Sequence, residues 1–340
     1  MRTAARVILG MLLVLLALEG VMRLLPVSTA TLSGYHFHPN IVTYPAHHHF
    51  IMATGWDLQR VQRHRSNNFG FLSRHEFEPD PNAVALVGDS FVEANMLPAS
   101  ERLDAQLEAR LATRRVYALG GPGSSLLDYA ERVRFAADRF AIKDFVVVIE
   151  QGDIKQTLCG SGNIHGPCLD PDDLRPRIER LPEADAGKRL LRHSAFAQYL
   201  VSQLQVNPGR LLKRIDPRQW LDTSERSKRD SAAPATIVER DTRIVTAFLT
   251  YLPRSNGERY VLIFDSPLRQ RSDDASHSAS TVMFMAQARQ AGLRVLDTAP
   301  IFRAQLDKAN LALHVSPRDT HWNGLANSVV AQALLPYLSQ

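Results

Sequence analysis

Two short groups of residues at opposite ends of the sequence carry the side chains that serine chemistry needs. The first is Gly88-Asp89-Ser90-Phe91, which follows an apolar run typical of a buried strand. A glycine lets the chain turn sharply out of a sheet, so the hydroxyl of Ser90 would stand at the edge where substrates bind. This position predicts that Ser90 is a nucleophile.

The second group, Asp319-Thr320-His321-Trp322-Asn323, precedes a helical pattern. Asn323 can cap that helix, which places His321 on the loop just before it. A carboxylate two residues away can fix the tautomer and orientation that a general base requires. Taken alone, an Asp-x-His is more often a capping loop with a surface histidine, and Gly-Asp-Ser is ordinary turn chemistry. Found in one chain, the two groups favour Ser90 as nucleophile, His321 as base and Asp319 as its orienting acid.

Alternating strand and helix patterns predict the scaffold that positions these residues. Short apolar runs at 83–87, 116–119, 145–149, 260–264 and 293–296 are typical of parallel strands buried on both faces. Helical periodicities lie between them. The alternation predicts a doubly wound, flavodoxin-like α/β fold with a parallel sheet of about five strands and flanking helices.

The order of these motifs resembles that of the SGNH/GDSL hydrolases, a family of serine esterases and acyltransferases. The resemblance rests on residues 88–91, the glycine turn Gly120-Gly121-Pro122-Gly123, the group Gln151-Gly152-Asp153, and residues 319–323. An N-terminal apolar span that contains a glutamate, followed by Asn67-Asn68-Phe69-Gly70-Phe71, is similar to membrane-anchored members associated with cell-surface polysaccharide. The resemblance covers about 1–160 and 240–340.

The resemblance implies an oxyanion hole with several donors. Ser90 would give its own backbone N–H, and Gly123 would give a second one from the glycine turn. The family usually has an asparagine as the third donor, and this chain has Gly152 there. Loss of one side-chain donor typically costs about 3–4 kcal/mol of transition-state stabilisation. The chemistry would therefore be slow unless another side chain replaces the asparagine.

Four further residues are expected to support the site. Gln151 and Gln156 carry amides that could replace the missing asparagine. Asp89 lies next to Ser90, and Asp153 lies next to Gly152. No cofactor and no metal ion are required by this chemistry. The histidines at 47–49, with two more at 36 and 38, are expected to form a polar surface loop, because adjacent residues of an extended segment point in alternating directions.

The N-terminal residues predict one membrane span. Arg2 and Arg6 precede an apolar stretch that runs to Leu25, long enough to cross a bilayer. Basic residues before the span favour a cytoplasmic N-terminus and a body in the periplasm or extracytoplasmic space, anchored in the inner membrane. A signal peptide cleaved near 28–30 is the alternative. Glu19 is costly at that depth and suggests association with a partner helix in the membrane.

The only two cysteines fit an oxidising compartment. Cys159 and Cys168 enclose a short loop rich in glycine, so the two sulfurs can meet. We expect a disulfide, with a pair of free or metal-binding thiols as the alternative. A disulfide across this loop would contribute roughly 2–3 kcal/mol in the chain-entropy model.

The chain is expected to divide into three parts. Residues 1–30 would be the signal anchor, 31–80 an extended connector that packs on the catalytic domain, and 81–340 the SGNH/GDSL-like domain. Within the last part, residues of about 170–236 form an insertion that is either a lid or a helical elaboration. A basic cluster in the insertion could contact anionic glycan or lipid headgroups, although such clusters are usually solvated; it comprises Arg210, Lys213, Arg214 and Arg218.

These observations lead to two function hypotheses. The first is an extracytoplasmic serine esterase or O-acyltransferase acting on acyl esters, with acetyl the expected group, of a cell-envelope carbohydrate. The second is a weak or inactive protein of the same fold that binds a glycan or helps to assemble and export it, alongside other envelope polysaccharide-assembly proteins. A lipid esterase is less favoured because the insertion has no strongly apolar lid. Nucleic acid is not expected as a partner, because 40 basic and 35 acidic residues are spread without a long basic block.

Overall fold

The computed structural model describes residues 2–161, 166–204, 206, 234–254, 257–274 and 276–338. The chain divides into two compact units. Unit 1 comprises Met1–Leu32, His49–Arg65 and Pro182–Ala232, and unit 2 comprises Ser33–His48, Ser66–Leu181 and Ala233–Gln340. All the residues with a predicted catalytic role belong to unit 2. The basic cluster at 210–218 lies outside the described residues.

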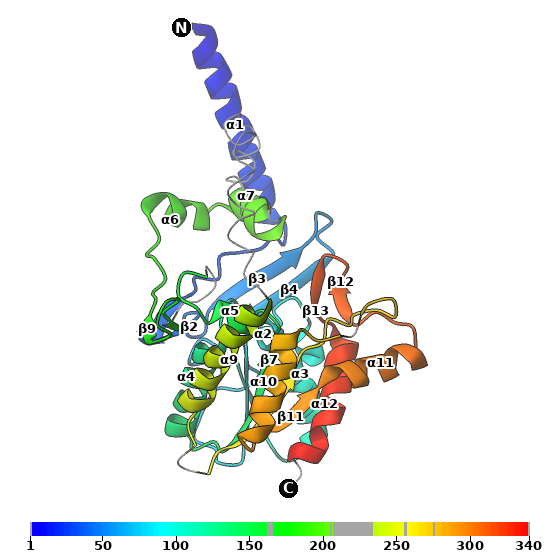
Figure 1. Cartoon of the computed structure of the whole chain (residues 1–340). Helices are drawn as coiled ribbons and strands as arrows, with labels where there is room; N and C mark the ends of the chain where they lie inside the picture. Colours follow the sequence, from blue (N-terminus) through cyan, green and yellow to red (C-terminus); the bar gives the residue numbers. More distant parts are fainter. Residues whose placement is uncertain are drawn as a thin grey trace. The chain divides into compact units, whose positions relative to one another are not determined.

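A five-stranded parallel sheet forms the centre of unit 2 (Figure 1). Its strands are β5 (Val84–Gly88), β6 (Val116–Gly120), β7 (Asp144–Ile149), β10 (Arg259–Phe264) and β11 (Arg294–Asp297). Their order is β11-β10-β7-β5-β6, and every neighbouring pair is parallel. The predicted doubly wound, flavodoxin-like sheet is therefore confirmed. The chain order reverses at β5, and ligands of such sheets bind at the carboxyl edge of this reversal.

Helices cover both faces of this sheet. One layer contains α4 (Leu126–Phe140), α9 (Pro234–Tyr251) and α10 (Ala279–Gln290), and the other contains α3 (Leu103–Leu111), α11 (Thr298–Lys308) and α12 (Gly324–Leu338). Alternate residues of a strand point into two separate cores, one on each face of the sheet. In β5, Ala85 and Val87 belong to the first core, and Val84 and Leu86 belong to the second. Because both faces are buried, the strands are continuous apolar runs in the sequence.

Short elements connect the strands and helices of unit 2. They are the hairpin β1 (Gly34–His38) and β2 (Ile41–Thr43), α2 (Ser90–Glu93), the 3₁₀ turn η1 (Ala99–Glu101), α5 (Asp153–Gln156), the hairpin β8 (Pro167–Leu169) and β9 (Pro176–Ile178), and the hairpin β12 (His314–Ser316) and β13 (Asp319–Trp322). Three of them, α2, α5 and β13, begin with residues of the predicted site.

Unit 1 contains the N-terminal helix. Its elements are α1 (Arg2–Leu24), the hairpin β3 (His49–Thr54) and β4 (Arg60–Arg65), α6 (Ala186–Arg192), α7 (Ala195–Gln198) and a π-helical turn η2 (Tyr199–Gln203). Helix α1 is long and apolar enough to cross a membrane, and it could equally be a signal sequence. The carboxylate of Glu19 accepts hydrogen bonds from the Ser194 hydroxyl and the N–H groups of Ala195 and Phe196, so its partner lies within this chain.

Residues 31–80 differ from the extended connector that the sequence predicts. They contain the two hairpins β1–β2 and β3–β4, which belong to different units. Their sequences are rich in His and Arg and lack clean alternation, because the strands are short and several positions on both faces stay partly exposed. The described part of the insertion likewise begins as a hairpin, β8–β9, and continues as short helices.

The predicted disulfide is present. Cys159 and Cys168 are bonded, with their Cα atoms 5.1 Å apart. The bond ties the segment after α5 to β8, and the N–H of Cys159 also donates to the carbonyl of Leu169 over 2.9 Å. The disulfide lies in the chain segment that follows Gln151-Gly152-Asp153, so it fixes where that segment leaves the sheet.

Candidate active site

Ser90, His321 and Asp319 lie in contact in one row. The hydroxyl Oγ of Ser90 is 2.8 Å from Nε2 of His321, and Nδ1 of His321 is 2.5 Å from Oδ1 of Asp319. With Nδ1 donating to the carboxylate, Nε2 is left free to accept the proton of the serine hydroxyl. The structure thus brings together the three residues that the sequence predicts, in the order that general-base activation of a serine requires.

The position of His321 follows from a short strand and not from a loop, as the sequence had predicted. Asp319 and His321 belong to β13, where residues two apart point to the same side. This spacing directs carboxylate and imidazole toward each other, while Trp322 points to the opposite side and is buried in the core, 1% exposed. Asn323 caps α12 as predicted, because its side chain accepts the N–H of Ala326 over 3.0 Å.

Ser90 begins helix α2 directly after β5. The side chain of Asp89 caps this helix by accepting the N–H of Phe91 over 2.9 Å. The turn needs the glycine before it, because a Cβ on Gly88 would come within 2.6 Å of Cγ2 of Val92. On β6, a Cβ on Gly120 would lie 2.3 Å from the backbone nitrogen of Glu93. Glycines at the ends of both strands therefore let α2 rest on the sheet edge.

A buried arginine joins this turn to the glycine turn after β6. Arg132 of α4 donates to the carbonyl of Gly88 over 2.8 Å and to Oγ of Ser124 over 2.5 Å. The Ser124 hydroxyl in turn donates to the carbonyl of Gly121 over 2.6 Å. The guanidinium is surrounded by protein, and burial lowers the pKa of Arg132. It fixes the two segments that carry the predicted oxyanion donors.

A second network holds the histidine strand. Asp265, which follows β10, accepts the indole N–H of Trp322 over 2.7 Å and the guanidinium of Arg269 over 2.5 Å. Arg269 also donates to the carbonyl of Thr320 over 2.7 Å, one residue before His321. Sequence reasoning missed this network. The position of Asp265 at the carboxyl end of a predicted strand was the signal that could have revealed it.

Buried acids shape the electrostatics around the serine. Burial raises the pKa of Asp89, Glu150, Asp153 and Asp265 above the ordinary range of carboxyl groups. Burial acts in the opposite direction on His321, but the hydrogen bond and charge of Asp319 outweigh it and raise the pKa of that imidazole. An imidazole of raised pKa is a stronger base for the proton of Ser90.

Two backbone donors are available for an oxyanion. Within the described part of the chain, neither the N–H of Ser90 nor that of Gly123 donates a hydrogen bond. The Ser90 N–H is the first of helix α2, which leaves it without an intrahelical acceptor. Gly123 has a φ of +73°, the left-handed region that favours glycine. These two donors match the roles that the family resemblance implies.

The third position is arranged differently. The N–H of Gly152 donates to the side chain of Glu150 over 2.5 Å and is therefore already used. A Cβ on Gly152 would lie 2.6 Å from Nε2 of Gln156 and 2.6 Å from Oε2 of Glu150. The Gln156 amide thus occupies the space in which an asparagine side chain would begin.

The remaining predicted support residues have separate roles. Asp153 is fully buried and accepts the Tyr129 hydroxyl and the N–H of Glu150, at 3.0 and 2.8 Å, so it holds the end of β7. Gln151 is half-buried and has no hydrogen bond among the described residues. No group of three or more His, Cys, Asp or Glu side chains in the described chain could hold a metal ion.

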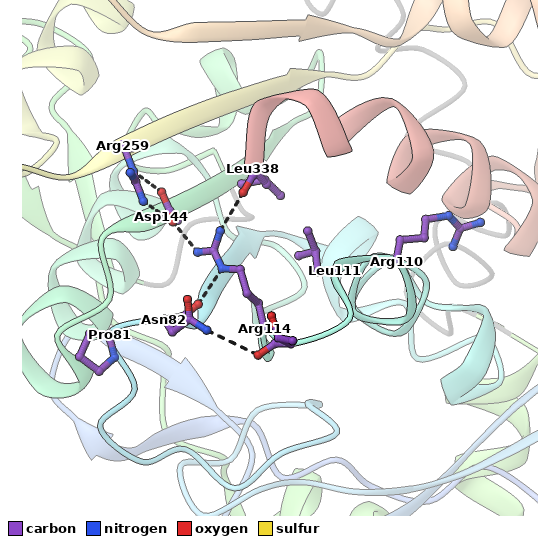
Figure 2. Close-up of a pocket in the computed structure, with 9 residues that line it drawn as sticks. Pro81, Asn82, Arg110, Leu111, Arg114, Asp144, Arg259 and Leu338 are labelled. Atoms are coloured by element: carbon purple, nitrogen blue, oxygen red, sulfur yellow. Dashed lines mark hydrogen bonds and ion pairs between the residues drawn. The ribbon is translucent and has the colours of Figure 1, made fainter. Parts of the chain in front are cut away.

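A cavity of about 410 Å³ lies away from this site, at the amino ends of the strands (Figure 2). Its arginines are used in structural contacts. Arg114 binds the carbonyls of Asn82 and Leu338 and the carboxylate of Asp144, which also accepts two bonds from Arg259 at 2.6 and 2.7 Å. The network joins the starts of three strands to the end of α12.

Comparisons with known proteins give matches to solved structures only. No protein-family model matches the chain, and no curated protein matches it. One match is a member of the lipolytic protein G-D-S-L family from Veillonella parvula DSM 2008 (10% identity, 76% of this chain and 98% of that chain, TM-score 0.38). A second is a lipolytic protein of the G-D-S-L family from Desulfitobacterium hafniense DCB-2, with 13% identity, coverage of 74% of this chain and 99% of that chain, and a TM-score of 0.36. A third is the acetyl xylan esterase AlAXEase, with 12% identity, coverage of 75% of this chain and 98% of that chain, and a TM-score of 0.35.

Two of these matches are of the family that the sequence motifs resemble. At such identities and TM-scores the likeness carries no argument about substrate or reaction. The functional argument therefore rests on the geometry of Ser90, His321 and Asp319 and on the donors beside them.

Replacing the acid should shift the pH dependence of any ester cleavage. His321 must be neutral to act as a base, so the rate falls as the pH drops through its raised pKa. Asp319→Asn removes the charge that raises this pKa. We expect the acid limb of the pH–rate profile to move to lower pH and the maximal rate to fall by roughly 10²–10⁴. The exposed Asp307→Asn is the matched control, and an unmoved acid limb in Asp319→Asn would contradict the assignment.

The third oxyanion donor can be tested at the amide beside Gly152. Because the Gln156 side chain occupies the place of the family asparagine, Gln156→Ala should lower kcat by about a hundredfold. Gln151→Ala is the comparison and should change kcat little. Gly152→Asn in the Gln156→Ala background, where space has been made, should restore part of the rate. An unchanged kcat in Gln156→Ala would show that Gln156 donates nothing to the oxyanion.

Proposed function

We propose that this chain is a serine hydrolase acting on ester bonds, or a closely related O-acyltransferase. The observation that supports this proposal is the pair of hydrogen bonds made by His321. Its Nε2 lies 2.8 Å from Oγ of Ser90, and its Nδ1 lies 2.5 Å from Oδ1 of Asp319. In this row the base contacts both the nucleophile and its orienting acid, which is the defining arrangement of acyl-transfer triads.

The reaction would run through an acyl-enzyme. Ser90 Oγ attacks the ester carbonyl while His321 Nε2 takes the hydroxyl proton, and the N–H groups of Ser90 and Gly123 stabilise the oxyanion. His321 then gives this proton to the departing alkoxide, so the alcohol leaves and the acyl group stays on Ser90. A water molecule or an acceptor hydroxyl, deprotonated by His321, then attacks the acyl carbonyl. The bond from the acyl carbon to Ser90 Oγ breaks, the acyl group leaves as the acid or the new ester, and His321 returns the proton to Ser90 Oγ.

The expected setting is the extracytoplasmic side of the inner membrane, with an acylated envelope carbohydrate as substrate and acetyl as the acyl group. Support comes from the basic residues before α1, the apolar length of that helix and the disulfide Cys159–Cys168, which suits an oxidising compartment. The small acyl group fits a mechanism that uses only a nucleophile, a base and an oxyanion hole.

The second candidate function is that of a protein which has this fold and binds a glycan without catalysing a reaction on it. The observation that favours it is Gly152, whose N–H is used by Glu150 and which has no side chain to donate. In that case the triad would be aligned but the oxyanion poorly stabilised.

Replacing the nucleophile Ser90 distinguishes the esterase proposal from the glycan-binding candidate. The full-length chain in detergent should hydrolyse p-nitrophenyl acetate, and Ser90→Ala should lower kcat/KM by roughly 10⁴-fold or more. Ser100→Ala, at an exposed serine, is the matched control and should retain full activity. Full activity in Ser90→Ala would refute the esterase proposal, and no activity in any of the three proteins would favour the glycan-binding candidate.

A further inference from the structure

A second cavity, of about 230 Å³, lies beside the glycine turn that follows β6. Its lining includes residues 42–44 at the end of β2, Gly70, Glu93 of α2 and residues 120–122 of the turn. All of them belong to unit 2. The cavity therefore shares one wall with the predicted oxyanion turn and another with the helix that Ser90 begins.

The charged group of the cavity is Glu93, one turn of α2 after the nucleophile. It is 2% exposed, and its carboxylate accepts the Tyr44 hydroxyl and the Asn95 amide, the latter over 3.3 Å. Burial raises the pKa of Glu93 to about 7, and the charges of Arg102, Arg132 and His321 oppose this rise. Glu93 and Ser90 lie on the same short helix, α2, three residues apart, so the cavity adjoins the reaction centre. The triad itself does not use Glu93.

One residue of the cavity wall, Thr43, also has a buried polar atom without a partner. Thr43 is 6% exposed, and its hydroxyl oxygen makes no hydrogen bond within the described part of the chain. A buried hydroxyl left without a partner typically costs about 1–3 kcal/mol, so such groups usually have a ligand or water as partner.

The Asn67–Phe71 motif builds this wall of the cavity. The side-chain oxygen of Asn67 accepts the N–H groups of Phe69 and Phe71 at 3.0 and 2.9 Å, which closes a tight loop. Gly70 then accepts the N–H of Tyr44 over 3.0 Å, and a Cβ there would lie 1.9 Å from the carbonyl oxygen of Tyr44. With its φ of +81°, this position requires glycine. The loop thereby sets the strand that carries Thr43 and Tyr44.

The size and chemistry of the cavity select its occupant. A volume of about 230 Å³ holds the equivalent of seven or eight waters at roughly 30 Å³ each, enough for one sugar ring and less than a drug-sized ligand needs. A hydroxyl group can donate to the Glu93 carboxylate and accept from Thr43 at the same time. An acyl chain would leave the Thr43 hydroxyl without a partner and has no donor to offer the Glu93 carboxylate.

We propose that this cavity binds the hydroxyl groups of a sugar ring, the alcohol part of the ester substrate, through Glu93 and Thr43. The assignment rests on the proposed ester chemistry for the identity of the sugar as substrate, but the binding itself does not require turnover. Tyr44 and the 67–71 loop act as positioning groups, because the Tyr44 hydroxyl donates to Glu93 and the loop binds the backbone next to Thr43.

Saturation-transfer NMR on the full-length Ser90→Ala chain in detergent micelles tests this directly. The probes are methyl β-D-glucopyranoside and methyl butyrate, an uncharged acyl compound of similar reach. The glucoside should bind and the butyrate should not. Thr43→Val, which removes only the hydroxyl, should weaken glucoside binding about fivefold to tenfold. Thr43→Ser should retain binding, and Thr250→Val, at an exposed position of α9, should leave it unchanged.

Three results would overturn the proposal: no saturation transfer to the glucoside, equal binding by the Thr43→Val chain, or binding of the butyrate in place of the glucoside. The Ser90→Ala chain lacks the nucleophile, so the binding result is independent of whether the wild-type chain hydrolyses esters. A failure of the esterase proposal and a failure of the sugar subsite can therefore be told apart.

Discussion

The hydrogen bond between the Ser90 hydroxyl and the imidazole of His321 joins positions 231 residues apart, and the rest of the site is arranged around it. One side is held by Arg132, which binds the carbonyl of Gly88 and, through Ser124, the glycine turn. The other is held by Arg269, which binds the carbonyl of Thr320 next to the base. Two buried guanidiniums on opposite faces of the sheet edge thus fix the 2.8 Å contact on which activation of the serine depends.

Burying these guanidiniums is tolerable because acids are buried with them. Asp265 pairs directly with Arg269, and Arg132 lies within the field of Asp89, Glu93 and Asp128. Burial raises the pKa of these carboxyl groups. Because the pKa of Glu93 rises to about 7, the protonation state of Glu93 at neutral pH depends on the charged groups around it. In such a low-dielectric setting, the backbone N–H groups of Ser90 and Gly123 would act on an oxyanion more strongly than in water.

The sheet, the contact of Ser90 with His321 and Asp319, and the disulfide could be predicted from the sequence, because each leaves a local signal: apolar runs, a glycine turn before a serine, a carboxylate two residues from a histidine. Arg132 and Arg269 left none, since an arginine on a helix or loop is ordinarily exposed and only the tertiary structure buries these two. The hairpins within 31–80 escaped prediction because partly exposed short strands lack alternation. Glu93 and Thr43 were missed for a related reason: the segments that line their cavity are distant from one another in the sequence.

The central claim, that His321 activates Ser90 for attack on an acyl group, is tested most directly by intact-mass analysis of the full-length chain after treatment with a serine-directed phosphonate. The account predicts a single covalent adduct that peptide mapping places on Ser90, and slow or absent labelling when His321 is replaced by alanine, since the hydroxyl then has no base. Labelling of Ser90 at an undiminished rate in His321→Ala, or an adduct on another serine while Ser90 stays unmodified, would contradict it.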